Sequence, residues 1–178
     1  MELRQLLAAL FVSVLSPATA LAFGGAAAEF GHEGQWVPNG KVNFTFESQN
    51  DADTTSFLLA PTLLYFITDH WAVGGGFTLG IVSGDGGDIT EIGLQPTVAY
   101  NLPISDNWSF LPQGSFYFVA LGGDADGQTL GLEFYAPFLF HAASHFFLGV
   151  GPVLRADVSS DAGEVFRFGA TSIVGGYF

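Results

Sequence analysis

The sequence FLLAPTLLYFITDHWAVGGGFTLGI occupies residues 57–81. It contains two apolar segments, and a short polar turn at residues 68–70 separates them. The second segment begins at Trp71, and its large apolar residues alternate with Gly, Ala and Thr. Strands joined by so short a turn can only pair antiparallel. This stretch therefore predicts a β-hairpin.

The same unit recurs twice further along the chain. Residues 96–100 lead through a turn at 102–107 to Trp108, and residues 137–140 lead through a turn at 141–145 to Phe146. Aromatic residues stand on both sides of each turn. The repetition predicts a series of antiparallel hairpins whose turns all lie at one end of the sheet.

The composition narrows the class of protein. The 178 residues suggest one domain; 49% are hydrophobic and 12% are charged, and that charged fraction is about half of the usual value. Gly counts 24, which disfavours helices, and no apolar run beyond the N-terminus reaches the roughly 20 residues of a spanning helix. An apolar, Gly-rich chain of this kind predicts a closed β-barrel in a membrane.

The N-terminus has the pattern of a secretory signal peptide. Arg4 precedes an apolar run at residues 6–15, and Ala20 and Ala22 supply the small residues of a cleavage site. The run is too short for a membrane-anchor helix, which is the alternative reading. We predict a signal peptide at residues 1–22, with cleavage after Ala20 as an alternative, and a short periplasmic lead at residues 23–34.

Eight strands are expected within residues 35–178, at about 35–48, 54–67, 70–83, 89–102, 108–121, 128–141, 146–158 and 164–178. In the first of them Val42, Phe44 and Phe46 alternate with polar residues, which assigns one face to lipid and the other to the interior. Three short turns alternate with four acidic loops at residues 49–53, 84–88, 122–127 and 159–164. The fold class is therefore all-β, an eight-stranded antiparallel up-and-down transmembrane β-barrel.

Large aromatic residues gather at the turn-side ends of the expected strands. A Trp ring rests well where its body is apolar and its N–H is hydrated, as at a membrane interface. We expect an aromatic girdle of Trp36, Tyr65, Trp71, Tyr100, Trp108, Phe140 and Phe146.

The chain ends in Tyr177 and Phe178. A last strand with a terminal aromatic resembles the signal by which outer-membrane proteins are recognised for barrel assembly. Residues 23–178 thus resemble the small eight-stranded outer-membrane β-barrels of the OmpX and OmpA transmembrane-domain type. The resemblance implies a Gram-negative outer membrane, periplasmic turns, extracellular acidic loops, contact with outer-membrane lipid, and the barrel-assembly machinery as a partner. It also implies that Phe178 is an assembly signal.

Charge and cysteine content exclude other classes of partner and cofactor. The net charge is −13, from 4 basic and 17 acidic residues, so nucleic acid is a poor partner. The absence of Cys excludes disulfides and thiolate metal sites. No cofactor is expected, and whether the acidic loops bind Ca²⁺ or Mg²⁺ stays open.

The interior of an eight-stranded barrel is just wide enough for its own side chains. We therefore expect a monomeric envelope component without an open channel and without enzyme activity. A small-solute or ion pore is the alternative, since the Gly-rich strand at 71–80 could leave a water path. An outer-leaflet lipid-modifying enzyme is less favoured, because the histidines fall in the lead or at turns, where we expect them to be solvated: His32, His70, His141 and His145. A soluble lipocalin-like barrel would need a polar outer face.

Charged residues on inward-facing strand positions predict a buried network. Arg155 and Arg167 lie about three residues from the outer ends of neighbouring strands, and Glu133 lies about five residues down the strand before them. These positions share one layer, so we expect a Glu133–Arg155–Arg167 network. Glu91 is a further candidate, and barrel closure brings Lys41 near.

Overall fold

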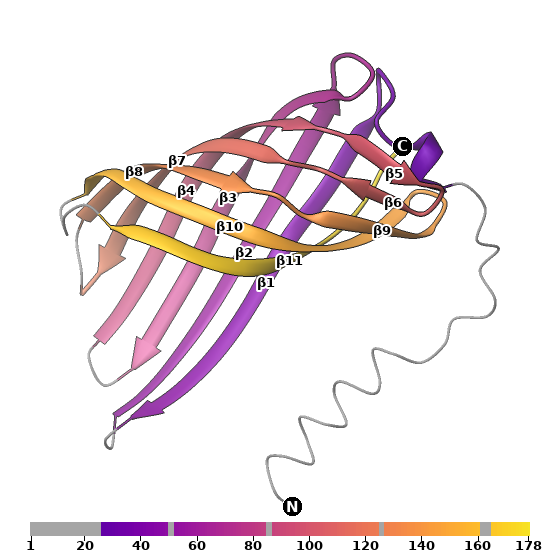
Figure 1. Ribbon diagram of the computed structural model, residues 1–178. Helices are drawn as coiled ribbons and strands as arrows, with labels where there is room; N and C mark the ends of the chain where they lie inside the picture. The colour runs from indigo at the N-terminus through magenta and orange to yellow at the C-terminus, as the bar shows by residue number, and fades with distance from the viewer. Residues whose placement is uncertain (1–25, 50–51, 85–86, 125–126, 161–164) are drawn as a thin grey trace, which may run out of the picture.

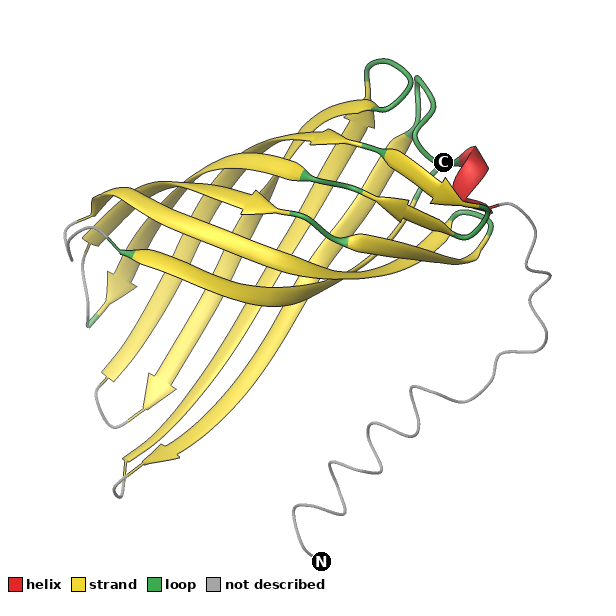
Figure 2. Cartoon of the chain, viewed as in Figure 1, coloured by secondary structure: helices red, strands yellow, loops and turns green. Residues whose placement is uncertain are grey.

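The computed structural model describes residues 26–49, 52–84, 87–124, 127–160 and 165–178 (Figure 1). The predicted signal peptide at 1–22 lies outside these residues, as do the side chains of Val42, Phe44 and Phe46. Across the described part of the chain, Figure 2 shows strands, short connections and one turn of 3-10 helix, η1 (Ala26–Glu29). None of these residues forms a helix long and apolar enough to cross a membrane.

The strands form a single antiparallel sheet. Their bounds are β1 (Trp36–Gln49), β2 (Ala52–Phe66), β3 (Trp71–Gly84), β4 (Gly87–Tyr100), β5 (Leu102–Ser105), β6 (Trp108–Phe110), β7 (Gln113–Gly123), β8 (Gly127–Tyr135), β9 (Phe138–Ala143), β10 (Phe146–Ser160) and β11 (Phe166–Gly176). Each of the pairs β4–β5, β6–β7 and β8–β9 continues one predicted strand past an interruption, and β5 and β9 extend into the predicted turns at 102–107 and 141–145. With each pair counted once, the described residues give eight strands.

Proline accounts for two of the interruptions. Pro112 lies between β6 and β7, and Pro137 lies between β8 and β9. Proline has no N–H to donate to a sheet ladder, so it breaks the pairing at its own position. The third interruption is at Asn101, whose backbone N–H donates to the carbonyl of His70 in a neighbouring turn (2.8 Å).

The sheet closes on itself, which confirms the predicted eight-stranded antiparallel barrel. Strands follow the order β11-β1-β2-β3-β4-β7-β8-β10, and β10 pairs again with β11. Two residue pairs, Asn39↔Gly175 and Gly40↔Val174, make up the described register between β1 and β11. Figure 1 shows these two strands diverging from there towards the loops.

The two ends of the barrel differ. The turn end carries the three short turns and both ends of the described chain, and the loop end lies opposite (Figure 1). Two turn-end histidines, His70 and His145, have φ of 79° and 66°. This left-handed region is uncommon for residues other than Gly, and Asn, Asp and His adopt it more readily than most.

The lumen near the turn end holds the densest packing. Its buried apolar residues form one cluster: Phe30, Val37, Leu64, Phe66, Ala72, Ala99, Leu111, Tyr135, Leu139, Phe147, Ile173 and Tyr177. The outer wall, in contrast, exposes large apolar side chains such as Phe77 at 52%, Leu94 at 64% and Val150 at 59%. Apolar residues thus face both directions at the turn end, whereas the charged residues described below lie inside.

Candidate functional site: the lumen and its closed end

Residues 26–35, which we call the N-terminal plug, cover the turn end of the barrel and place Phe30 inside the lumen. The sequence predicts a short periplasmic lead at residues 23–34 and gives no sign of its packing, and Phe30 is only 3% exposed. Its ring centroid lies 5.4 Å from that of Phe66, 5.1 Å from His141, 5.5 Å from Phe147 and 5.2 Å from Tyr177. The plug therefore completes the core of the barrel instead of extending away from it.

Backbone hydrogen bonds attach the plug to the barrel. The N–H of Ala27 donates to the carbonyl of Asp106 (2.9 Å), and the N–H of His70 donates to the carbonyl of Gly31 (2.7 Å). The side-chain amide of Asn101 donates to the carbonyl of Phe30 (2.9 Å). Gly31 has a φ of 97°, and a Cβ there would lie 2.4 Å from the Asn101 side chain, so glycine is required for this close approach.

A carboxylate in the first turn holds the outer edge of the plug. Asp69 accepts a hydrogen bond from the backbone N–H of Glu33 (3.1 Å), and the His32 ring nitrogen Nδ1 lies 3.3 Å from the same oxygen. Hydrogen bonds to a carboxylate favour its charged form. The Glu33 N–H, followed by His32, therefore lowers the pKa of Asp69 below its ordinary value of 3.8.

His141 departs from the expectation that the turn histidines are solvated. It is 1% exposed, and its Nε2 lies 2.9 Å from Oγ of Ser109, which is also buried. A Ser–His contact is the first requirement of nucleophilic catalysis. Both side chains lie inside the lumen next to Phe30, however, so neither atom is accessible to a substrate in this structure. His32 and His145 are exposed, and His70 is half-buried.

An ion-pair group inside the lumen, the lumen triad, consists of half-buried Lys41 and Arg155 and buried Glu133. Glu133 is 5% exposed and pairs with both cations: Lys41 Nζ donates a hydrogen bond to Oε1 (3.1 Å), and Arg155 Nε lies 2.7 Å from Oε2 as an ion-pair contact. Gln95 donates a further hydrogen bond to Oε1 (2.9 Å). The β10–β8 register places Arg155 directly opposite Glu133. Each cation also stacks on a ring, Lys41 on Tyr135 and Arg155 on Tyr117.

Arg167 does not join the triad, so that part of the predicted network is wrong. Its guanidinium instead pairs with Asp157 through two contacts, Nη2 to Oδ2 at 2.9 Å and Nη1 to Oδ1 at 3.2 Å. Tyr117 donates a hydrogen bond from its hydroxyl to the same carboxylate. Arg155 and Arg167 are direct cross-strand partners, and two cations so placed repel each other.

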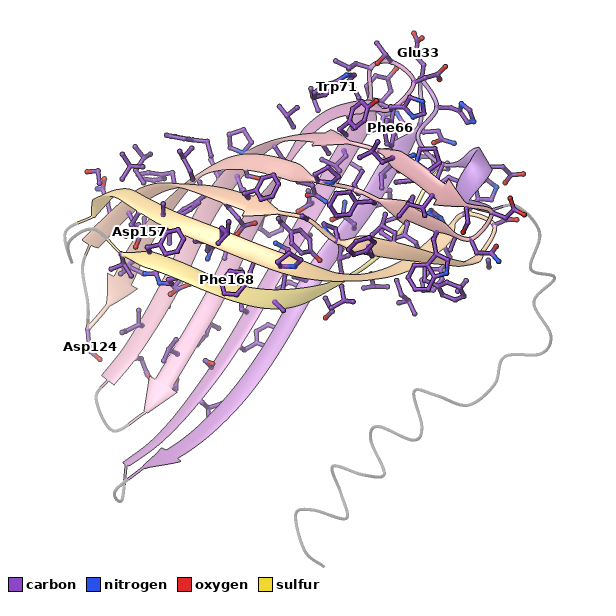
Figure 3. All side chains as sticks on the ribbon, in the orientation of Figure 1. Glu33, Phe66, Trp71, Asp124, Asp157 and Phe168 are labelled. Carbon is purple, nitrogen blue, oxygen red and sulfur yellow. The ribbon has the colours of Figure 1, made fainter. Side chains whose placement is uncertain are left out.

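Asp157, which is 5% exposed, was not predicted as a member of the network. It stands two residues after Arg155 on β10, so both side chains face inward. This two-residue spacing is the sequence pattern from which Asp157 could have been predicted to lie in the lumen. Figure 3 labels Asp157 towards the loop end, and Phe66 and Glu33 at the turn end. The two ion-pair groups thus occupy the loop half of the lumen, away from the aromatic cluster.

Two adjoining cavities occupy the loop half of the lumen. One has a volume of about 350 Å³ and is lined in part by Lys41, Glu133 and Gln95. The other, of about 410 Å³, is lined in part by Asp157 and Arg167. Glu91, Val119 and Arg155 line both cavities. The Glu91 carboxylate forms no ion pair with a described cation, so it stands apart from the triad.

The predicted girdle residues lie at the turn end, and six of them meet in cross-strand ring pairs. Ring centroids are 4.7 Å apart in Trp36–Tyr65, 4.9 Å apart in Trp71–Tyr100 and 5.1 Å apart in Trp108–Phe140. The three Trp side chains are 43%, 50% and 44% exposed in chain order, and Phe146 is 40% exposed. These rings therefore face outwards around the barrel.

Comparison of the sequence with protein-family models and with curated proteins gives no match.

Proposed function

We propose that the protein is an integral outer-membrane β-barrel, a structural component of the cell envelope without an open channel. The turn end faces the periplasm and the loop end faces outwards. The observation that carries this proposal is the outward row of exposed apolar side chains on successive strands. It includes Phe77, Leu79, Ile81, Ile92, Leu94, Val98, Phe116, Phe118, Leu132, Phe134, Leu148 and Val150.

Such a surface suits lipid better than water. Soluble monomers rarely expose contiguous apolar patches larger than a few hundred Å², whereas membrane barrels carry an apolar band around the wall. The same strands turn Thr78, Thr97, Ser115 and Glu133 inwards, where these polar residues are buried. This arrangement disfavours a lipocalin-like barrel, because a barrel dissolved in water needs a polar outer face.

The proposed family membership rests on three features of the chain. Membership of the OmpX and OmpA transmembrane-domain type rests on the eight-stranded barrel, the expected signal peptide and the terminal Phe178. With it come the proposals that the protein is a monomer and that the barrel-assembly machinery is its partner during biogenesis. Extraction of Gram-negative membranes with alkaline carbonate tests the location. We expect the protein to stay in the outer-membrane pellet, and its release into the soluble fraction would refute the proposal.

Packing at the turn end supports a barrel that does not conduct. Phe66, Leu111, Leu139 and Phe147 are each fully buried in the lumen, and Phe30 packs among them. We expect purified protein in planar bilayers to give no discrete conductance steps, with a general porin as the positive control. Reproducible steps from the intact chain would favour the pore instead.

The lipid-modifying enzyme is the weaker alternative. Its chemistry would require a histidine at the outer leaflet, and the four histidines lie at the turn end or in the plug. Mass analysis of lipid A from cells with and without the protein should give the same masses. A new acylation state would overturn this part of the proposal.

A further inference from the structure

The two lumen cavities adjoin, since Glu91, Val119 and Arg155 line both of them, and we call them together the chamber. The aromatic cluster and the plug close the chamber towards the turn end. Any ligand must therefore enter from the loop end or through the wall. The charged groups that line this chamber decide which chemistry it can hold.

The lumen triad carries one more positive than negative charge. It has two cations, Lys41 and Arg155, and they share the single carboxylate of Glu133. Arg155 uses Nε for that contact, and its Nη1 and Nη2 donate to no described residue. Lys41 gives one of its three donors to Glu133. Donors thus remain on both cations for an anionic group in the chamber.

Glu91 supplies the complementary charge. Its side chain lines both cavities and pairs with no cation of the described residues. Gly80 makes room for it, because a Cβ at Gly80 would lie 3.1 Å from Oε2 of Glu91. This carboxylate is half-buried and free to accept from a cationic group in the chamber. The site therefore suits an ammonium group close to Glu91.

The wall next to the chamber has little strand pairing along one seam, between β1 and β11. The cavity of about 350 Å³ is lined by Ala170, Thr171 and Ser172, three consecutive residues of β11. Consecutive strand residues face opposite sides of a sheet. The cavity therefore passes the edge of β11, where the described β1–β11 register has ended at Gly40↔Val174.

We propose that this chamber binds a small zwitterion, with the anionic group on Arg155 and Lys41 and the ammonium group on Glu91. The zwitterion comes either from a free solute that enters at the loop end or from a phospholipid head group whose chains pass through the seam. The binding site itself depends on the barrel and not on its location, so it can be tested in detergent.

Phosphoethanolamine is the probe, titrated into folded protein in a non-ionic detergent and followed by ³¹P NMR. We expect saturable binding, and Glu91→Gln should weaken it about tenfold while leaving the binding of inorganic phosphate unchanged. A tenfold loss corresponds to about 1.4 kcal/mol. Asp106→Asn, which changes an exposed turn carboxylate, is the matched control and should bind as the wild type does.

The proposal is overturned by any of three results. These are the absence of saturable binding, equal affinity for phosphate and phosphoethanolamine, or an unchanged affinity in Glu91→Gln. Dihexanoyl phosphatidylethanolamine then separates the sources. Tighter binding than phosphoethanolamine identifies a lipid head group, and equal or weaker binding identifies a free solute. Failure of these titrations would leave the proposed outer-membrane location untouched.

Discussion

Glu133 is a single inward-facing residue that pairs with charged residues from two other strands. Its carboxylate lies between two cations from strands that are far apart in the sequence, β1 and β10. Inward-facing charges in a narrow lumen are predictable from strand alternation, and so is the pairing of Glu133 with Arg155. The pairing of Arg167 with Asp157 is not predictable from strand alternation. It depends on which rotamers fit beside Tyr117 and on the repulsion between Arg155 and Arg167.

The triad predicts unequal costs for its members. Glu133→Leu leaves two half-buried cations without their partner and should cost about 3 kcal/mol in the free energy of unfolding, the low end for breaking a buried pair. Arg155→Met should cost less, since Lys41 still pairs with Glu133. Urea unfolding in detergent micelles, with both single variants and the double variant, measures the coupling. Simple addition of the two single costs in the double variant would mean that the pair does not interact.

Asp69 gives the plug a pH dependence. Because its pKa is lowered in the folded state, its contact with the Glu33 N–H contributes fully above the ordinary value of 3.8 and is lost as the pH falls through the lowered pKa. The NMR shift of the Glu33 amide should therefore titrate with a midpoint below 3.8. Asp69→Asn should abolish that titration. A midpoint at or above the ordinary value would refute the assigned contact.

At the scale of elements, the packing of the plug is the main feature that the sequence does not predict. Residues 23–34 lack strand alternation and are rich in Gly and Ala, so the sequence alone gives them no place in the barrel. The remaining signal is Phe30, a large apolar residue with polar and small neighbours at residues 24–34. Its place depends on the space between Phe66, Phe147 and Tyr177, which the folded barrel creates.

Phe30→Ala should destabilise the folded protein by about 3–5 kcal/mol, the usual cost of truncating a buried Phe. The variant should also expose residues 26–35 to protease. Phe168→Ala is the matched control, because Phe168 is 73% exposed, and it should cost far less in detergent. Equal urea midpoints for the two variants would show that the plug does not stabilise the barrel.

The terminal residue joins the first and last strands. The N–H of Trp36 donates to the carbonyl of Phe178 (2.9 Å), and the N–H of Phe178 donates to that of Trp36 (3.1 Å). Its ring is 73% exposed, so the side chain adds little to the folded state. Phe178→Ala should refold in micelles with nearly wild-type stability but accumulate poorly in the outer membrane. Wild-type levels in cells would remove the assembly-signal role.

At the scale of the whole molecule, the barrel could be predicted from residue alternation and from the number of turns and loops. The hairpin at residues 57–81 appears as β2 and β3, and its Trp71 faces outwards as alternation requires. Strand interruptions beside Pro112 and Pro137 were missed, although proline is a local signal. The short β1–β11 pairing could not be predicted from the sequence, because barrel closure depends on the shear of the entire barrel and not on any one segment.

Heat-modifiability of the protein in separated outer-membrane and soluble fractions tests the central claim most directly. In a closed barrel every strand pairs with two neighbours, so the fold withstands SDS until it is boiled and then unfolds as a unit. We predict that the protein is found in the outer-membrane fraction and migrates at two gel positions, one before boiling and another after it. Recovery in the soluble fraction, with one position under both conditions, would contradict the transmembrane barrel.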